Sequence, residues 1–267
     1  MGPRPKQSNG ELDIGYDMKQ RCLLILLSLV FACDSADAPD CFKSAGPVVR
    51  EEFTVDAFDK IRIEDDVALE ISQGTSHKVF IETGQNLLAD IEVKLEGSTL
   101  VIRNTNSCNL FRDYPQVKAI VESPNISEIR NSSIGDVKSD GVLNFPTLVL
   151  ISNTTGNVED SRKSGDFYLE VQCERFEISA NGFSRFFISG YAEDATIAFE
   201  DEVPLFEGRQ LIVDDLVIFQ RSANIMRVNP RLSIKGDIRG TGDVISVFRP
   251  PIVDVEEFYT GRLIFQD

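Results

Sequence analysis

Few residues of this chain have the chemistry for catalysis, and the cysteines are the most informative of them. Among 267 residues there are five cysteines, one histidine and no tryptophan. A single histidine removes most histidine-based metal sites and acid–base schemes. His77 lies beside Lys78, which is typical of the solvated start of a strand, and the chain contains no Gly-x-Ser-x-Gly motif. We therefore predict no catalytic residue, no cofactor and no metal site.

Acidic side chains are abundant, with 43 Asp and Glu against 27 Lys and Arg and a formal net charge of −16. This balance argues against a nucleic-acid partner, because phosphate binding needs clustered Lys and Arg. Adjacent pairs such as Asp65-Asp66 point to opposite sides of a strand and do not form a carboxylate dyad. Asp201 and Asp214, from successive repeats, could converge on Ca²⁺. A solvated anionic face accounts for the same residues.

The sequence before Cys33 predicts lipidation of that cysteine. A basic stretch, 18–21, precedes an apolar run of 11 residues, 22–32. This run is too short to span a bilayer and is typical of a signal peptide. It ends in Val30-Phe31-Ala32-Cys33, which resembles the bacterial lipobox, although Phe31 replaces the usual small residue. An ordinary signal peptide cleaved elsewhere, or a short buried helix, is the alternative.

These signals divide the chain into five segments. Acidic residues in 1–17 precede the basic stretch, which indicates a start-site artefact with translation beginning at Met18. The others are a signal peptide at 18–32, an acidic tether at 33–46, an N-terminal β part at 47–125 and stacked coils at 126–267.

The predicted location is the bacterial cell envelope, as an outer-membrane lipoprotein facing either the periplasm or the cell surface. A lipid anchor must hold it there, because anionic headgroups repel an anionic domain.

Three cysteines remain after the signal peptide and Cys33. Disulfides persist outside the cytoplasm. Cys173 shares the parity of Phe167 and Leu169 along a strand, which predicts a buried thiol. Cys41 follows the acidic stretch 34–40 of the tether and Cys108 lies in a polar turn, so we predict a disulfide between these two.

The hydropathy pattern predicts an all-β protein. From Val48 onward, short runs rich in Val, Ile and Phe alternate apolar and polar residues between Gly, Asn, Asp or Ser. No window of a dozen residues sustains helical spacing. The best helical candidate, 84–90, is one or two turns long.

The second half repeats an apolar residue, a cluster of small polar residues and another apolar residue. The apolar anchors are Ile129, Leu150, Ile178, Phe199, Phe219 and Ile238. Their spacing is close to 20 residues once the polar insert 160–166 is left out. Such a period predicts a right-handed, single-stranded, β-helix-like β-solenoid with about 20 residues per coil and the anchors stacked in one interior column. A β-sandwich of hairpins is the alternative.

The strand and turn pattern is similar to that of the head GIN domain family, a family of unknown activity described by name as an auto-transporter adhesin. The matching segments are 53–63, 67–74 and 91–102, followed by the polar corners, and the resemblance covers roughly 50–250. It implies a lipoprotein of Bacteroidetes-type bacteria, and it supplies no catalytic residue.

The sequence therefore predicts a lipid-anchored, non-catalytic envelope protein whose β-solenoid binds an unidentified protein or glycan. The alternatives are a β-helical carbohydrate-active enzyme, either a lyase or a hydrolase, and a structural or sensing domain of the envelope. Arg162 and Lys163 form the conspicuous basic pair near a turn that an enzyme could use.

Overall fold

The protein is described by a computed structural model covering residue 2 and residues 44–106, 116–156 and 161–266. Cys33, Cys41, Cys108 and the predicted signal peptide lie outside the described residues. The described chain is all-β, as predicted, and its short helix η3 (Gln85–Asp90) is a single 3₁₀ segment. No helix among these residues has the length and hydropathy needed to cross a bilayer. The strands are β1 (Val48–Phe53), β2 (Lys60–Asp65), β3 (Ala68–Gln73), β4 (Lys78–Gly84), β5 (Ile91–Glu96), β6 (Thr99–Asn104), β7 (Lys118–Ser123), β8 (Glu128–Ser133), β9 (Val137–Leu143), β10 (Thr147–Ser152), β11 (Phe167–Ala180), β12 (Arg185–Phe199), β13 (Leu205–Glu207), β14 (Leu211–Gln220), β15 (Met226–Val228), β16 (Pro230–Ile238), β17 (Val244–Ser246), β18 (Ile252–Glu257) and β19 (Leu263–Phe265).

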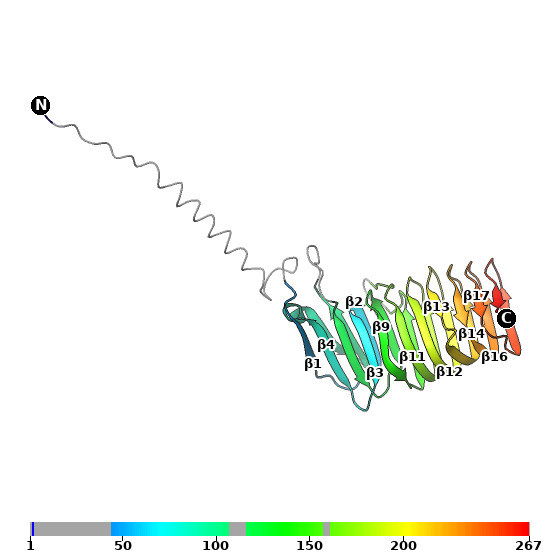
Figure 1. The fold of residues 1–267 in the computed structure, drawn as a ribbon, viewed down its shortest axis with the longest axis horizontal. Helices are drawn as coiled ribbons and strands as arrows, with labels where there is room; N and C mark the ends of the chain where they lie inside the picture. Colours follow the sequence, from blue (N-terminus) through cyan, green and yellow to red (C-terminus); the bar gives the residue numbers. More distant parts are fainter. Residues whose placement is uncertain (1, 3–43, 107–115, 157–160, 267) are drawn as a thin grey trace.

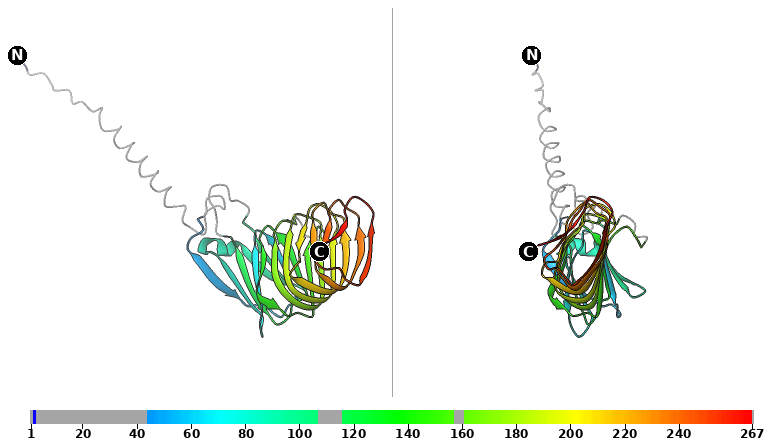
Figure 2. Two further views of the ribbon diagram at one scale, coloured as in Figure 1. Left: turned by 45° about the vertical axis from the view of Figure 1, so that its right-hand side comes forward. Right: turned by 90° about the vertical axis from the view of Figure 1, so that its right-hand side faces the viewer.

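Two ladders of stacked parallel strands run along the long axis of the molecule (Figures 1 and 2). The first ladder contains, in order, β6, β2, β8, β10, the C-terminal halves of β11, β12 and β14, and then β16 and β18. The second contains β7, β3, β9 and the N-terminal halves of β11 and β12, followed by β13, β15, β17 and β19. The chain passes repeatedly from one ladder to the other. Each strand of a ladder, called a rung below, hydrogen-bonds to the strands before and after it in that ladder.

The N-terminal strands form a mixed sheet that is nearly closed and barrel-like. Strand β4 pairs antiparallel with both β1 and β7, and β5 pairs antiparallel with β6. The remaining pairings of this part, including β2 with β8, are parallel and lead directly into the ladders. The predicted N-terminal part and the repeats thus share one continuous sheet.

Pairs of adjacent outward side chains mark the corner where a long strand passes from the second ladder to the first. In β11 the buried positions are odd-numbered up to Cys173 and even-numbered from Phe176 onward. The switch occurs at Glu174-Arg175, and Glu193-Asp194 occupies the same place in β12. Two successive polar residues therefore bend the strand and let both of its halves bury their apolar side chains.

The predicted single column of anchors is correct for its first half and wrong for its second. Ile129, Leu150 and Ile178 are consecutive partners in the first ladder and are buried. The next members of this column are Ile197 and Ile218 rather than Phe199 and Phe219.

The three displaced anchors have different positions. Phe199 and Ile238 lie in the adjacent interior column, where Gln220 separates them. Phe219 has the opposite parity and faces outward. A shift by two residues preserves inward orientation, so the apolar pattern alone does not choose between the two columns, whereas backbone pairing does.

Small polar residues close the bends, as the sequence predicted. The Asn131 side chain accepts a hydrogen bond from Ser133 N at 2.9 Å, and Asn153 accepts one from Thr155 N at 3.0 Å. Arg130 is 8% exposed and donates to Asn153 Oδ1 at 3.2 Å and Thr155 O at 2.9 Å. Burial lowers the pKa of this guanidinium. Side chains at these bends therefore supply hydrogen-bond partners for backbone groups inside the molecule.

Cys173 is a buried free thiol on the apolar side of β11, as its parity predicted. Burial raises the pKa of this thiol to about 11. A thiol that stays protonated at neutral pH is a poor nucleophile. Its place in the core is therefore that of a small apolar side chain.

Asp166 joins the start of β11 to the start of β12. Its Oδ1 accepts a hydrogen bond from Arg185 N at 2.9 Å, and its Oδ2 accepts one from Arg185 Nε at 2.8 Å. Tyr168 Oη also donates to it, at 3.3 Å. The Asp166 side chain is 7% exposed, so these bonds lie in a partly dry environment.

We expect Asp166→Ala to lower the free energy of unfolding by about 2 kcal/mol, because the Arg185 amide loses its acceptor in a place that water reaches poorly. Asp166→Asn is the matched control and should cost about half as much, since its carbonyl still accepts from that amide. Urea unfolding followed by circular dichroism measures both. Equal losses for the two variants would contradict this role of the backbone acceptor.

Candidate functional site

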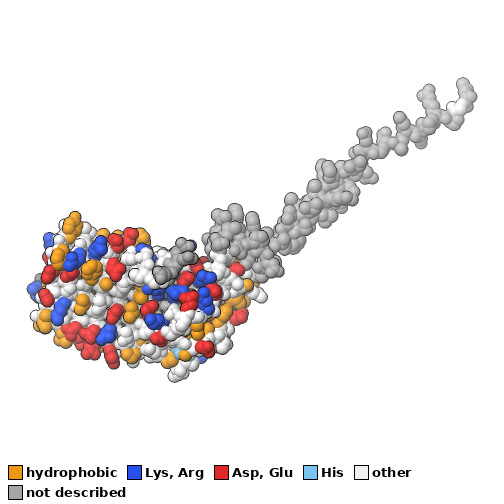
Figure 3. Space-filling view, turned by 180° about the vertical axis from the view of Figure 1, so that it is seen from behind, with side chains coloured by type: hydrophobic (Ala, Val, Ile, Leu, Met, Phe, Trp, Pro, Cys, Tyr) orange, Lys and Arg blue, Asp and Glu red, His pale blue; other side chains and the backbone are white. Residues whose placement is uncertain are grey.

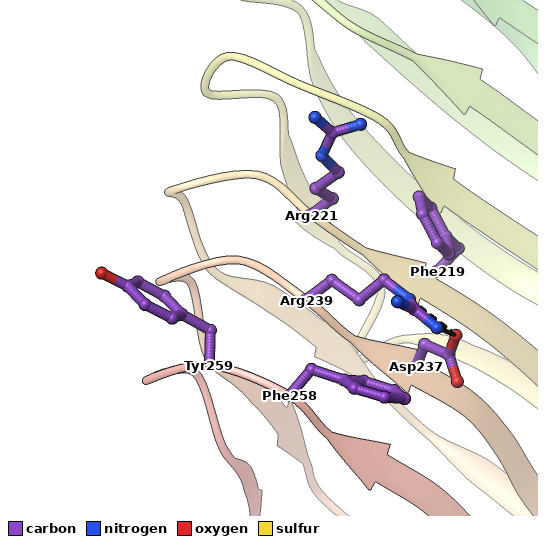
Figure 4. A pocket seen from close by; sticks show the side chains of 6 residues that line it. All are labelled: Phe219, Arg221, Asp237, Arg239, Phe258 and Tyr259. Atoms are coloured by element: carbon purple, nitrogen blue, oxygen red, sulfur yellow. Dashed lines mark hydrogen bonds and ion pairs between the residues drawn. The ribbon is translucent and has the colours of Figure 1, made fainter.

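An open groove of about 550 Å³ lies on the outer surface near the C-terminal end of the first ladder. Figure 4 shows that its side chains come from three successive rungs. The lining residues are Phe219, Arg221, Asp237, Arg239, Phe258 and Tyr259. Its volume is within the roughly 300–1,000 Å³ of small-molecule sites.

Parallel stacking places these residues together although they are far apart in the sequence. Phe219 and Asp237 are direct partners between β14 and β16. Beyond these strands the amide of Arg239 donates to Gln220 O at 2.7 Å, and the amide of Phe258 donates to Ile238 O at 2.8 Å. The residues following each strand therefore lie in register, one rung apart.

An ion pair and a cation–π contact fix one side of the groove. Arg239 Nε donates to Asp237 Oδ2 at 2.8 Å. The Arg239 guanidinium carbon lies 3.9 Å from the centroid of the Phe258 ring. Figure 4 shows the guanidinium lying along this ring with its end directed at Asp237. Stacking and the ion pair together hold a donor and an acceptor side by side on the surface.

The remaining groups of the groove are open to solvent. Phe258 is 50% exposed and Tyr259 is 61% exposed. No hydrogen bond or ion pair joins the Arg221 side chain to another residue in the described part of the chain. The groove therefore presents aromatic surface, one unengaged guanidinium and one neutralised ion pair, all of which can contact a polar ligand.

The sequence pattern alone does not indicate this groove. It assigned Phe219 to the interior, and it placed no functional role on the other five residues. The nearest signal in the sequence is an aromatic residue two positions before an arginine, at Phe219 and Arg221. Its meaning depends on the rungs that follow.

The other candidates from the sequence lie elsewhere. His77 Nδ1 is 3.2 Å from Ser123 Oγ, and that hydroxyl donates to Asn125 O at 3.0 Å. Ser123 is fully buried, so this contact closes a loop. Arg162 and Lys163 lie between β10 and β11, away from the groove, and Lys163 Nζ donates to Asn181 O at 2.9 Å.

Asp201 and Asp214 do not meet. Asp214 follows Val213, whose partner is Ala192 in the middle of β12, whereas Asp201 comes after the end of that strand. Asp214 instead accepts a hydrogen bond from Tyr191 Oη at 2.6 Å, which raises the pKa of that tyrosine to about 12. Within the described ranges no group of three or more His, Cys, Asp or Glu side chains is placed to hold a metal ion.

The chain resembles several solved structures. A crystal structure of a "putative adhesin" from Bacteroides fragilis NCTC 9343 has 19% sequence identity and a TM-score of 0.72, and covers 82% of this chain and 97% of its own. A "putative adhesin" from Parabacteroides distasonis ATCC 8503 has 13% identity and a TM-score of 0.61, with coverage of 83% and 98%. A "putative lipid binding protein" from the same organism has 15% identity and a TM-score of 0.59, with the same coverage. At these identities the likeness shows the fold.

No curated protein matches the chain. The family model described as "Putative auto-transporter adhesin, head GIN domain" matches residues 57–250. This match spans both the barrel-like part and most of the two ladders. The chain therefore belongs to the head GIN domain family.

Proposed function

We propose that the protein is a lipid-anchored, non-catalytic adhesin of the bacterial outer membrane that binds its ligand through the C-terminal groove. The observation that carries this proposal is the groove itself, a concave site with solvent-exposed aromatic and arginine side chains in a chain of this family. Its neutralised ion pair and exposed rings are suited to binding. As part of this proposal, the lipid is attached to Cys33, and Cys41 and Cys108 form a disulfide.

The fold supports a display role. Strand β1 lies at one end of the body, and the groove is formed by the last rungs at the other end (Figure 1). A lipid attached upstream of β1 would leave the groove directed away from the membrane. We further infer that the ladders form a right-handed β-solenoid of about 20 residues per coil, because connections between parallel strands of one sheet are almost always right-handed.

The test is performed on cells. A Bacteroidetes-type strain expressing the full chain is compared with the same strain carrying an empty vector, for adhesion to surfaces coated with mucin or with fibronectin. The proposal expects a gain in adhesion to at least one surface, and loss of the protein when intact cells are treated with protease. No gain in adhesion, or turnover of a polysaccharide by the purified protein, would contradict it.

A further inference from the structure

We propose that the ligand of the groove is an uncharged oligosaccharide, bound by stacking on Phe258 and Tyr259 and by hydrogen bonds to the Asp237–Arg239 pair. This inference rests on the proposed function, because it names the class of ligand for the same site. It follows from the exposure of the rings, the hydrogen-bonding groups that remain available and the charge around the groove.

The aromatic residues supply an apolar surface of the right kind. The Arg239 guanidinium covers one face of Phe258, yet the residue remains 50% exposed, and no strand beyond β18 covers it within the described residues. The face of an aromatic ring is electronegative and attracts weakly polarised C–H groups. A pyranose ring has such groups on one face and hydroxyl groups around its edge.

The ion pair supplies hydrogen bonds to those hydroxyl groups. The hydrogen bond from Arg239 Nε and the ion pair with its terminal nitrogen both end on Asp237 Oδ2, and no described residue donates to Asp237 Oδ1. The carboxylate therefore keeps an acceptor beside the donors of the guanidinium. Two neighbouring sugar hydroxyls, one donating and one accepting, match this arrangement, and Arg221 offers further donors across the groove.

Charge selects against acidic glycans. Within the groove, Arg239 is neutralised by Asp237 and Arg221 is uncompensated, so the selection comes from the acidic residues on the neighbouring rungs, which outnumber this one cation. Asp237 is paired in register with Glu256, which is exposed. On the other side, Ala223 N donates to Glu202 O, so the acidic run Glu200–Glu202 occupies the rung next to Arg221.

The wider surface has the same sign. Figure 3, which views the face opposite to that of Figure 1, shows a group of acidic side chains along the lower edge of the C-terminal end, with Lys and Arg side chains interspersed with acidic ones above it. The whole chain carries a formal net charge of −16. A uronate polymer would meet repulsion from this field, whereas an uncharged saccharide would not.

The experiment uses the purified full-length protein in detergent and immobilised oligosaccharides. The probes are cello-, manno- and galacto-oligosaccharides as uncharged ligands and oligogalacturonate as the acidic one. We expect binding to at least one uncharged probe, with an affinity that is unchanged between about 0.05 and 0.5 M NaCl. Phe258→Ala and Asp237→Ala should each weaken it by about tenfold or more.

Phe183→Ala is the matched control, because Phe183 is 55% exposed but lies outside the groove, and it should leave binding unchanged. The inference is overturned if none of the uncharged probes binds, if oligogalacturonate alone binds, or if Phe183→Ala weakens binding as much as Phe258→Ala. Adhesion of expressing cells separates the two proposals. Adhesion of cells that express the unchanged protein, together with no binding of any uncharged probe by that protein, would overturn the glycan inference and leave the adhesin proposal in place.

Discussion

Replacing Cys33 with serine is expected to move the protein from the membrane fraction to the soluble fraction and to abolish its labelling by fatty acid. The acyl chains of a bacterial lipoprotein attach through the cysteine sulfur and amine, and several chains together anchor a protein stably where one chain binds only marginally. The anionic body gives no compensating attraction to anionic headgroups. Loss of the anchor should therefore change membrane association by more than about tenfold.

Metabolic labelling with an alkyne analogue of palmitate, followed by cell fractionation, measures this effect. Cys22→Ser is the matched control, because Cys22 lies at the start of the same apolar run and is removed with the signal peptide in our proposal. Label on Cys33→Ser at the level of the unchanged protein would exclude Cys33 as the acylated residue. Equal loss of label in Cys22→Ser would point instead to a general failure of export.

Alanine at Gly190 or Gly236 is expected to destabilise the ladders more than any other single methyl group added to the strands. Gly190 has φ +108° and Gly236 has φ +122°, a region that side chains rarely adopt. A Cβ atom at Gly190 would lie 2.0 Å from Val171 O, and one at Gly236 would lie 1.9 Å from Ile218 O. Both oxygens belong to the backbone of the preceding rung, so neither can move without separating paired strands. We expect a loss of about 3 kcal/mol or more in the free energy of unfolding.

Gly97→Ala separates the cost of the positive φ angle from the cost of the contact between the added Cβ atom and the neighbouring rung. Gly97 has φ +64° in the turn between β5 and β6, and nothing lies within 4 Å of its added Cβ. This variant should therefore cost about 1 kcal/mol, which is the cost of the backbone conformation alone. Urea and thermal unfolding of the three variants measure the difference. If the variants at Gly190 and Gly236 lose no more free energy of unfolding than the variant at Gly97, the prediction is contradicted, because paired rungs would then move apart easily to admit a methyl group.

The sequence contained enough information for the class of fold and for several local features. Alternation of apolar and polar residues predicts strands directly, because successive side chains of a strand point to opposite faces. The burial of Cys173 follows from the same rule. The bends at Asn131 and Asn153 could also be anticipated, because their side chains bond to an amide two residues away, which is a local interaction.

The two pairs of charged residues that form the strand corners are visible in the sequence, but only the structure shows that the strands bend there. Glu174-Arg175 and Glu193-Asp194 interrupt the alternation by one residue. In the sequence such an interruption is equally consistent with the end of one strand and the start of another. The structure shows that the strand continues and bends, since pairing resumes on the other side of the corner.

Sequence by itself determined that this chain forms strands with apolar inner faces, small polar bends and a period near 20 residues, because these depend on neighbours along the chain. Tertiary structure alone decided which residues of successive rungs are partners. Backbone pairing moved the interior column from Phe199 to Ile197, and from Phe219 to Ile218. It thereby placed Phe219 outside, next to Asp237. The groove exists because stacking brings together residues that the chain keeps a full rung apart, and no local pattern encodes that contact.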